Sequence, residues 1–267
     1  MNDAAAHSSA DWSLECVGLS VRLGGRLVVN DVSLSLRAGQ CVSIVGPNGS
    51  GKTTLLLALL GLLSPAAGSV RFNGRDLRRL SARARGRVAA YVPQMVDLVP
   101  AFRVYDVVAG GRFAHVPTLG SLSDEDHAAV ARALSQCGLA ELAQRTFDTL
   151  SGGERRKTLL AAAIAQDPHV MMLDEPNTAL DPAYQIELVR ILHGWRCGQR
   201  GLLLVSHELQ LPAALGGRVI ALRAGRVSAD GPAEETLTPQ TLSEIYSAPF
   251  GTVTTEGGRR IVLPEWW

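Results

Sequence analysis

Residues 46–53 form a glycine-rich segment whose composition and spacing suit a loop that binds phosphate groups. The segment follows a short apolar run at residues 41–45 and opens a stretch with helical composition at residues 52–63. Glycines let backbone amides curl around phosphates without Cβ clashes, and a helix start adds a favourable dipole. Lys52 would reach the β- and γ-phosphates and Thr53 would bind Mg²⁺. An ordinary glycine-rich turn is the alternative, and the flanking strand and helix argue against it. The residues assigned to nucleotide binding are Gly46, Pro47, Asn48, Gly49, Ser50, Gly51, Lys52, Thr53 and Thr54.

Two adjacent acids, Asp174 and Glu175, end an apolar run at residues 170–173. A buried strand seldom ends in neighbouring carboxylates unless a cation lies nearby. Asp174 suits the carboxylate that holds Mg²⁺ in phosphoryl-transfer sites. Glu175 would then lie beyond the metal, where it can orient and deprotonate the attacking water. A solvated turn after a core strand would explain these two residues alone, but together with the glycine-rich loop they favour the catalytic interpretation.

A third segment, residues 150–154, reads Leu-Ser-Gly-Gly-Glu at an apparent helix start. It offers a hydroxyl and two flexible backbone amides at a helix N-terminus, which is a second arrangement suited to an anion. A plain helix cap is the alternative. Placed shortly before the acidic strand, the segment resembles the signature motif of the ATP-binding cassette (ABC) ATPase family, in which Ser151, Gly152 and Gly153 would contact nucleotide.

Further segments match this family in the same order along the chain. Gln94 follows an apolar run and resembles the glutamine of the Q-loop. Residues 178–181 resemble the D-loop, which ends here in Asp181. His207 follows a buried strand and resembles the switch histidine. Any of these alone is more often structural, but the ordered set is very hard to obtain by chance.

The resemblance implies an ATPase that converts ATP and water to ADP and phosphate, with ATP and Mg²⁺ as cofactors and hydrolysis coupled to transport. By this resemblance Asp181 also binds nucleotide. Two copies would pack head to tail, so that the Ser151 segment of one chain meets the nucleotide held by Lys52 of the other. The implied catalytic residues are Glu175, His207 and Gln94, and the implied metal ligands are Thr53, Gln94 and Asp174.

The resemblance covers the chain from about Trp12 and implies a fold as well. The fold is α/β, a P-loop NTPase (RecA-like) core with an antiparallel β subdomain and an inserted helical subdomain. We expect the ATPase domain at residues 12–250, with the helical subdomain at about 97–150. Residues 1–11 are expected to be a disordered N-terminal segment and residues 251–267 a C-terminal tail.

Local patterns predict the elements that must position these residues. Residues 14–36 alternate apolar and polar around Gly24-Gly25 and Asn30-Asp31, which predicts half-buried strands joined by turns. Short apolar runs predict further strands, and their alternation with helices predicts a parallel sheet. These strands are predicted at residues 41–45, 69–72, 170–173 and 202–205. Helix starts are predicted at Ser123, Asp181-Pro182 and Thr238-Pro239, and a hairpin at Ala224-Gly225.

Composition excludes several classes of protein. The 267 residues carry 26 basic and 25 acidic side chains, so the net charge of +1 gives no general field that attracts nucleic acid. The longest apolar stretch, residues 55–63, is far shorter than the ~20 residues of a membrane-spanning helix. Four cysteines without paired spacing predict buried reduced thiols, and the start of the chain lacks the pattern of a secretory signal. We therefore expect a cytoplasmic protein.

Residues 106–115 and the capped helix that follows resemble the helical subdomain of bacterial importers for iron-siderophores, haem and cobalamin. Residues 225–246 are similar to the same subfamily. This resemblance implies a peripheral ATPase pair at the cytoplasmic face of the inner membrane. Its partners would be multispanning permeases, fed by an extracytoplasmic binding protein. The alternatives are an ABC transporter for another metal ion or an amino acid, and a soluble ABC ATPase without a transport role.

Several features depart from the family pattern or lie outside it. Leu23 stands where an aromatic residue often stacks on adenine, and Asn177 stands where Thr is commoner. Six arginines at residues 75–87 lack interleaved aromatic side chains, which favours a solvated helix face over a nucleic-acid site. Trp266-Trp267 would pack on the body of the protein or on a partner. Four histidines without ligand spacing are expected to be at the surface or structural: His115, His127, His169 and His193.

Overall fold

The computed structural model describes residues 11–94, 102–117, 119–177, 181–196, 199–256 and 260–265. The described residues form two compact units, each with its own internal contacts. The first holds residues 11–13, 37–39 and the described part of 71–202, and the second holds residues 14–36, 40–70 and the described part of 203–265. Residues 1–10 and Trp266-Trp267, on which two predictions fall, lie outside the described residues.

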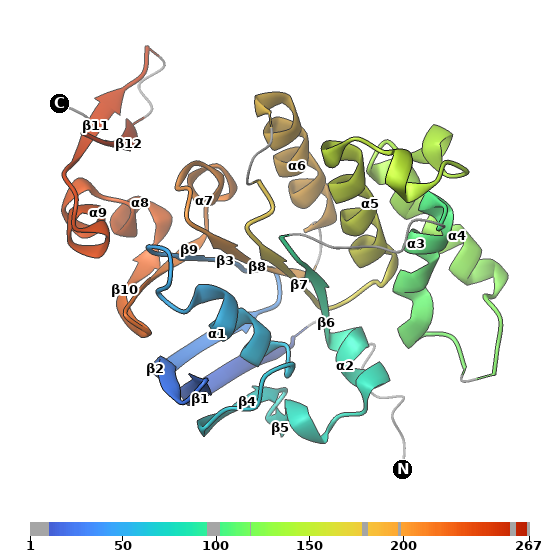
Figure 1. Cartoon of the computed structure of the whole chain (residues 1–267), viewed down its shortest axis with the longest axis horizontal. Helices are drawn as coiled ribbons and strands as arrows, with labels where there is room; N and C mark the ends of the chain where they lie inside the picture. The colour runs from blue at the N-terminus through green and yellow to red at the C-terminus, as the bar shows by residue number, and fades with distance from the viewer. Residues whose placement is uncertain are drawn as a thin grey trace. The chain divides into compact units, whose positions relative to one another are not determined.

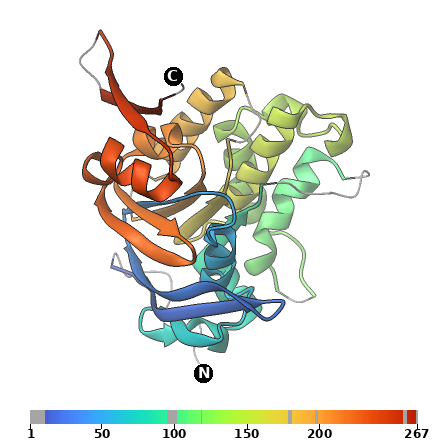
Figure 2. The same cartoon turned by 60° about the vertical axis from the view of Figure 1, so that its left-hand side comes forward.

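In the second unit, a long hairpin joins β1 (Ser13–Leu23) to β2 (Arg26–Arg37), and β4 (Ala67–Phe72) lies beside β1. Figure 2 shows the two long strands side by side. The predicted turn at Gly24-Gly25 is confirmed, since both residues have positive φ. The predicted turn at Asn30-Asp31 is wrong: both residues lie within β2.

Hydrogen bonds explain why Asn30 and Asp31 stay in the strand. The Asn30 N–H donates to the carbonyl of Gly225 (2.8 Å), and the Asp31 N–H donates to the Ser20 hydroxyl (3.0 Å). Asp31 has φ 56°, so the chain kinks locally without turning back. Partners that are distant in sequence therefore override a local turn preference.

The second unit also contains a mainly parallel sheet with strand order β10-β9-β3-β8. Strand β3 (Cys41–Val45), fully buried, pairs in parallel with β9 (Arg218–Arg223). The predicted hairpin at Ala224-Gly225 is confirmed and leads into β10 (Arg226–Pro232), which is antiparallel to β9. The predicted parallel pairing and the predicted strands β3 and β8 (Gly201–Ser206) are therefore confirmed.

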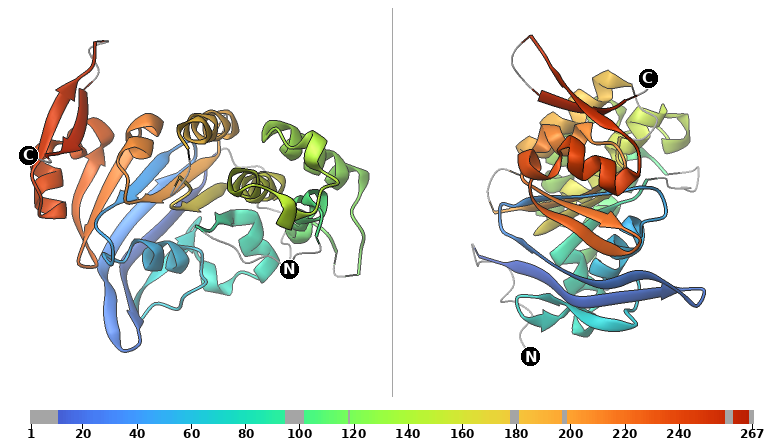
Figure 3. Two further views of the ribbon diagram at one scale, coloured as in Figure 1. Left: turned by 45° about the horizontal axis from the view of Figure 1, so that its top comes forward. Right: turned by 90° about the vertical axis from the view of Figure 1, so that its left-hand side faces the viewer.

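Helices and a small hairpin complete the second unit (Figure 1). Helix α1 (Lys52–Leu59) is shorter than predicted, because Gly61 has φ 70° and ends the helical turn. Thr238 caps α9 (Pro239–Tyr246) as predicted. In both panels of Figure 3, the hairpin of β11 and β12 projects beyond α9. The remaining elements are α7 (Gln210–Leu215), α8 (Ala233–Thr236), α9 (Pro239–Tyr246), β11 (Phe250–Thr254) and β12 (Arg260–Pro264).

In the first unit, β6 (Ala89–Val92) and β7 (Val170–Asp174) pair in parallel. Helix α5 (Gly152–Ala165) packs against both α3 (Val104–Gly110) and α4 (Asp124–Gln136), as Figure 1 shows. The remaining elements are β5 (Arg75–Asp76), α2 (Ala82–Val88), α6 (Pro182–Trp195) and 3₁₀ helices at Leu77–Arg79, Gly111–Ala114, Ala140–Leu142 and Phe147–Thr149. The predicted caps of α4 and α6 are confirmed, with Ser123 and Asp181 at the N-cap positions.

The arginine-rich residues 75–87 do not form one solvated helix face, so this prediction is wrong. They run through β5, a 3₁₀ helix and α2. Arg85 donates to the carbonyl of Leu80 (3.0 Å), and Arg87 donates to the carbonyl of Ala114 (3.1 Å). Guanidinium groups offer several fixed donors, which suits them to satisfying backbone carbonyls. At least these two arginines therefore serve the fold.

The surroundings of several side chains test predictions that were made from residue type. His169 is structural, since its ring packs with those of Trp12 (centroids 6.0 Å apart) and Phe72 (centroids 5.3 Å apart) in the first unit. The Trp12 indole donates to the carbonyl of Gln199 (2.7 Å), which satisfies its polar atom. The cysteines in the described part of the chain are buried and outside disulfides, as predicted, namely Cys16, Cys41 and Cys137. Cys197 lies outside the described residues.

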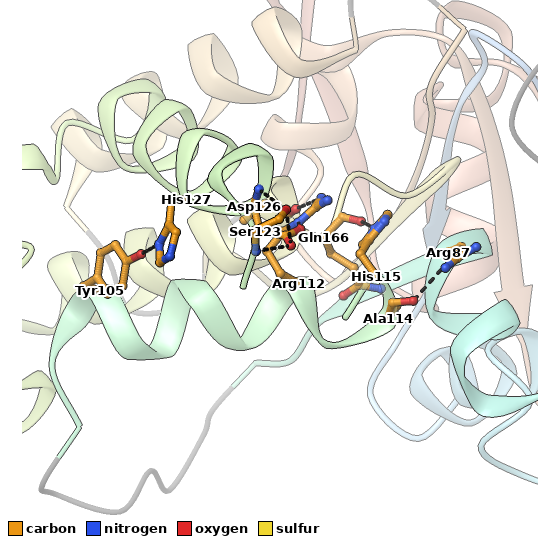
Figure 4. Close-up of polar contacts among 10 residues, drawn as sticks. Arg87, Tyr105, Arg112, Ala114, His115, Ser123, Asp126, His127 and Gln166 are labelled. Atoms are coloured by element: carbon orange, nitrogen blue, oxygen red, sulfur yellow. Dashed lines mark hydrogen bonds and ion pairs between the residues drawn. The ribbon is translucent and has the colours of Figure 1, made fainter. Parts of the chain in front are cut away.

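An ion pair between Arg112 and Asp126 lies inside the helical part of the first unit (Figure 4). The Arg112 Nε atom donates to Asp126 at 2.8 Å, and both side chains are over nine-tenths buried. Arg112 also donates to the carbonyl of Ala165 at the end of α5 (2.8 Å). Asp126 further accepts from the backbone and hydroxyl of Ser123. The pair thus joins the 3₁₀ helix Gly111–Ala114, α4 and α5.

The Asp126→Asn variant is expected to be less stable by about 3–5 kcal/mol, because it leaves the Arg112 charge buried without its partner. Chemical denaturation measures this loss. Asp124→Asn, an exposed carboxylate in the same first turn, is the matched control and should cost below about 1 kcal/mol. Equal losses in the two variants would contradict the importance of the ion pair.

The same ion pair predicts a loss of stability in acid. The backbone of Ser123 and then the Arg112 guanidinium lower the pKa of Asp126 to about 2, although burial opposes the shift. A carboxyl whose pKa is lower in the folded state stabilises the fold above its unfolded pKa of about 3.9. This contribution is lost as the pH falls from about 4 to about 2, and Asp126→Asn should lack it.

Candidate active site

The glycine-rich loop in the second unit is built so that two of its glycines cannot be replaced without strain. Gly46 has φ 150°, and a Cβ there would lie 2.1 Å from the Leu222 carbonyl oxygen. Gly51 has φ 100°, and a Cβ there would lie 2.7 Å from the Val28 carbonyl oxygen. Backbone at both positions therefore approaches neighbouring strands more closely than any other residue allows.

Lys52 is the first residue of α1 and is buried, with 5% of its surface exposed. Its ammonium group donates to the carbonyl of Gly46 (2.8 Å) and to that of Pro47 (3.0 Å), so the charge lies inside the curl of the loop. The Ser50 hydroxyl is buried and makes no hydrogen bond within the described part of the chain. A buried cation and an unsatisfied hydroxyl in a glycine loop at a helix start fit a bound phosphate group.

The other loop residues differ in exposure. Asn48, Gly49 and Thr53 are exposed, whereas Thr54 is buried on the inner side of α1. The Thr53 hydroxyl is therefore on a surface where a ligand could meet it. A cation bound with nucleotide would use such an oxygen together with phosphate oxygens.

The acidic pair lies at the end of β7 in the first unit. Asp174 is buried and accepts a hydrogen bond from the Tyr91 hydroxyl at 3.4 Å. Burial, and secondly the Asp174 charge, raise the pKa of Tyr91 to about 12, so the phenol keeps its proton and remains a donor. Glu175 has φ 47°, which turns the chain sharply after the strand.

The fold brings the side chains of Gln94 and Glu175 into contact. Neither of the two sequence motifs predicts this contact by itself. The Gln94 amide nitrogen donates to the Glu175 carboxylate at 2.9 Å, across 81 positions of sequence. Gln94 is exposed, so solvent or a ligand can reach this pair. A partly exposed carboxylate oriented by an amide is an arrangement that can accept a proton from water.

The serine-glycine segment forms the start of α5. The Ser151 hydroxyl accepts from the Glu154 N–H (3.3 Å), and Glu154 accepts from the Ser151 N–H (2.8 Å), which completes a capping box. The Ser151 backbone N–H lowers the pKa of Glu154. Ser151 and Gly152 are exposed, and a Cβ on Gly152 would meet no atom within 4 Å. The segment is thus a helix cap with open space in front of Gly152.

Two further predicted residues occupy helix or strand ends. Asp181 is exposed and caps α6, where its carboxylate accepts from the Tyr184 N–H at 2.8 Å. Residues 178–180 of the predicted D-loop lie outside the described residues. His207 follows β8 in the second unit, and its carbonyl accepts a hydrogen bond from the Tyr246 hydroxyl at 3.4 Å.

The predicted residues are divided between the two units. The loop at residues 46–54 and His207 belong to the second unit, and the remaining predicted residues belong to the first. Sequence reasoning missed two tyrosines that hold members of the set, Tyr91 and Tyr246. A phenol in the short apolar strand before Gln94 is the signal that could have identified Tyr91.

Leu23 and Asn177, which depart from the family pattern, differ in exposure. Leu23 ends β1 and is 43% exposed, so it offers an apolar surface at the tip of the hairpin. The neighbouring Arg22 guanidinium donates to the carbonyl of Gly25 (2.9 Å). Asn177 is buried.

The described residues contain neither a cluster of metal-binding side chains nor a membrane-spanning helix. No group of three or more histidine, cysteine or acidic side chains in the described ranges could hold a metal ion. A site that holds Mg²⁺ through one carboxylate and phosphate oxygens needs no such group. Among the described helices, none combines the length and the apolar character that crossing a bilayer requires.

Comparison with known proteins extends these observations. The family model described as ABC transporter matches residues 29–178. The iron(3+)-hydroxamate import ATP-binding protein FhuC of Bacillus subtilis is 35% identical over 91% of this chain and 90% of its own length. The hemin import ATP-binding protein HmuV of Streptomyces coelicolor is 41% identical over 87% of this chain and 82% of its own length.

A solved structure agrees with these matches. A metal-chelate type ABC transporter in an inward-facing conformation aligns with a TM-score of 0.83 and 25% identity, over 96% of this chain and 98% of that chain. The predicted P-loop NTPase fold, with parallel and antiparallel sheets, is therefore confirmed. The family and sequence matches support ATP binding directly. The chain therefore belongs to the ABC transporter ATP-binding family and is an ATPase coupled to transport.

Proposed function

We propose that the chain is the ATPase subunit of a bacterial importer for a metal complex of the iron-siderophore, haem or cobalamin kind. The observation that carries this proposal is the extent of the matches. Import ATP-binding proteins for iron-hydroxamate and hemin align over about nine-tenths of the chain, well beyond the cassette motifs. The aligned metal-chelate transporter covers nearly the whole chain as well.

Within this proposal, the glycine-rich loop binds the triphosphate. Lys52 exchanges its two backbone carbonyl partners for β- and γ-phosphate oxygens, which are stronger acceptors. Thr53, Asp174 and Gln94 are the proposed ligands of Mg²⁺, which would neutralise charge on the phosphates. Burial of Asp174 beside a neutral phenol supports its role, because a buried carboxylate benefits from a cation.

Glu175 is the proposed general base, and Gln94 and His207 assist it. The hydrogen bond from Gln94 orients the Glu175 carboxylate, which accepts a proton from the attacking water. Ser151, Gly152, Gly153 and Asp181 are proposed to meet the nucleotide of a second copy in a head-to-tail dimer. The exposure of Ser151 and the open space before Gly152 support this role.

The proposed partners are permease subunits of the inner membrane, with an extracytoplasmic binding protein acting through them. Phe113, in the 3₁₀ helix Gly111–Ala114, is 70% exposed, and Arg83 lies 5.7 Å from its ring centroid. Phe102 is also 48% exposed. Large exposed apolar side chains in the helical part of the first unit support docking of a partner there. The chain would then work as a peripheral protein at the cytoplasmic face.

Phe113→Ala is expected to reduce ATP-driven transport at least about tenfold while basal hydrolysis by the isolated subunit stays unchanged, because a docking anchor is lost. Transport into proteoliposomes and ATPase rates in solution measure the two effects. Val17→Ala, which changes an apolar residue on β1 that is 59% exposed, is the matched control. Loss of transport and basal hydrolysis together would indicate misfolding and contradict the docking role.

The cargo class is tested by reconstituting the chain with a permease and a binding protein from the same organism. We expect ATP hydrolysis to be stimulated by binding protein loaded with a ferric siderophore, haem or cobalamin. Stimulation only by zinc, manganese or an amino acid would favour another ABC transporter. Failure to associate with any permease would favour a soluble ABC ATPase, such as a translation factor or an iron-sulfur assembly scaffold.

A further inference from the structure

Tyr246, the last residue of α9, lies where the C-terminal part of the second unit meets the candidate active site. Leu242 and Ile245 of α9 are fully buried in a hydrophobic cluster that includes Val45, the residue directly before the glycine-rich loop. Tyr246 packs against the same cluster, as does Leu209, two residues after His207. The cluster therefore brings the end of α9 close to both the loop and the His207 segment.

The Tyr246 phenol hydrogen-bonds to the backbone of the His207 segment. Its hydroxyl donates to the His207 carbonyl at 3.4 Å. Burial raises the pKa of Tyr246 to about 12, and a hydrogen bond with the Gly46 backbone partly opposes this rise. The phenol therefore keeps its proton at physiological pH and remains a donor. One side chain thus hydrogen-bonds to His207 and packs on the cluster that includes Val45, directly before the loop.

The neighbouring contacts leave little freedom to this arrangement. The Gly46 carbonyl accepts from Lys52, and the Gly46 Cα faces the Leu222 carbonyl too closely for any side chain. On the other side, the Ser206 hydroxyl accepts from the Glu208 N–H (3.0 Å) and donates to the Glu208 carbonyl (2.7 Å), which holds the turn around His207. Tyr246 contacts the His207 segment through its hydroxyl and packs on the cluster that includes Val45, at the start of the loop.

We propose that Tyr246 is a positioning residue that holds His207 at a set distance from the glycine-rich loop and so controls the rate of ATP hydrolysis. This inference rests on the role of His207 in the proposed function. A phenol bound only to backbone atoms cannot donate to the phosphates itself. Its loss should therefore affect turnover, which needs accurate geometry, more than ATP affinity, which the loop provides.

The C-terminal hairpin gives this residue a structural support. The ring of Phe250, the first residue of β11, lies 5.7 Å from that of Tyr246, and its N–H donates to the Ser243 hydroxyl (3.1 Å). Ser247, between them, has φ 55°, and its hydroxyl accepts from Arg223 (3.2 Å). The ring contact with Phe250 and the Ser247 hydrogen bond support the position of the phenol.

The test compares Tyr246→Phe with Ser243→Ala in the full-length protein. Both remove one hydroxyl from α9, but only the Tyr246 hydroxyl hydrogen-bonds to the His207 segment. We expect Tyr246→Phe to lower kcat about three- to tenfold, while the Kd for ATP from equilibrium titration changes less than about twofold. Thermal unfolding should shift equally in the two variants, and Ser243→Ala should keep the wild-type kcat.

Amide hydrogen exchange without nucleotide gives a readout that is independent of activity. Tyr246→Phe should exchange faster in peptides covering residues 43–50 and 205–210, and Ser243→Ala should not. Unchanged exchange and kcat in Tyr246→Phe would overturn the inference. Parallel losses of kcat, ATP affinity and thermal stability would overturn it as well, because they would indicate general destabilisation.

His207→Ala separates this inference from the proposed function. If Tyr246 acts through His207, adding Tyr246→Phe to His207→Ala should slow hydrolysis no further. A full additional loss in the double variant would contradict the positioning role. A normal rate for His207→Ala alone would instead contradict the role assigned to His207, while the exchange measurement would still report whether Tyr246 holds the segment.

Discussion

Glu175→Gln is expected to bind ATP, to lose at least about 10²-fold in kcat, and to accumulate as an ATP-bound dimer. Glutamine keeps the shape of the side chain and can still hydrogen-bond to Gln94, but it cannot accept a proton from water. General-base catalysis contributes about 10²- to 10⁴-fold to enzymatic rates, which sets the size of the expected loss. Size-exclusion chromatography with ATP and a steady-state ATPase assay measure both effects.

The control for this variant is Glu141→Gln, an exposed carboxylate in the 3₁₀ helix Ala140–Leu142. It should hydrolyse ATP at the wild-type rate and should not accumulate as a dimer. A Glu175→Gln protein that stays monomeric with ATP and turns over near the wild-type rate would disprove the assignment of Glu175 as the base. The proposal for ATP binding by the loop would survive that result, because the loop is tested separately.

Lys52→Ala is expected to lower ATP affinity about 10²-fold. The Lys52 ammonium is the point charge that the loop itself supplies to the β- and γ-phosphates, and hydrogen bonds to charged groups contribute about 1.5–3 kcal/mol each. The loss of two such bonds, partly compensated by solvent, corresponds to a decrease in ATP affinity of roughly 10²-fold. Equilibrium titration with a fluorescent ATP analogue measures the change.

The sequence offers a matched control, because Lys52 and Lys157 are its two lysines. Lys157 is paired with Glu187 (2.5 Å) between α5 and α6, and Lys157→Ala should keep ATP affinity within about twofold. Unchanged affinity in Lys52→Ala, with thermal stability equal to that of the control, would show that the loop does not bind the triphosphate through this residue.

Local sequence patterns determined a large part of the fold. The apolar run at residues 41–45 corresponds to β3, and the residues Ser123, Asp181 and Thr238 cap the helices predicted from them. Such signals depend on residues within a few positions of one another, because burial periodicity and helix caps are local properties. The motifs that identify the family are local as well, since each is a short loop at the end of a strand or the start of a helix.

Tertiary structure decided the features that depend on distant partners. Asn30 and Asp31 remain in a strand because Gly225 and Ser20 hydrogen-bond to them, and Arg87 binds the carbonyl of Ala114 instead of facing solvent. The pairing of Gln94 with Glu175 spans 81 positions and cannot be read from either segment. A hydrogen bond requires its two atoms to lie within about 3.5 Å, and for residues far apart in the chain only the folded structure sets that distance. The sequence by itself therefore determined the family and most of the elements, whereas the packing of the folded chain determined how the catalytic residues are held.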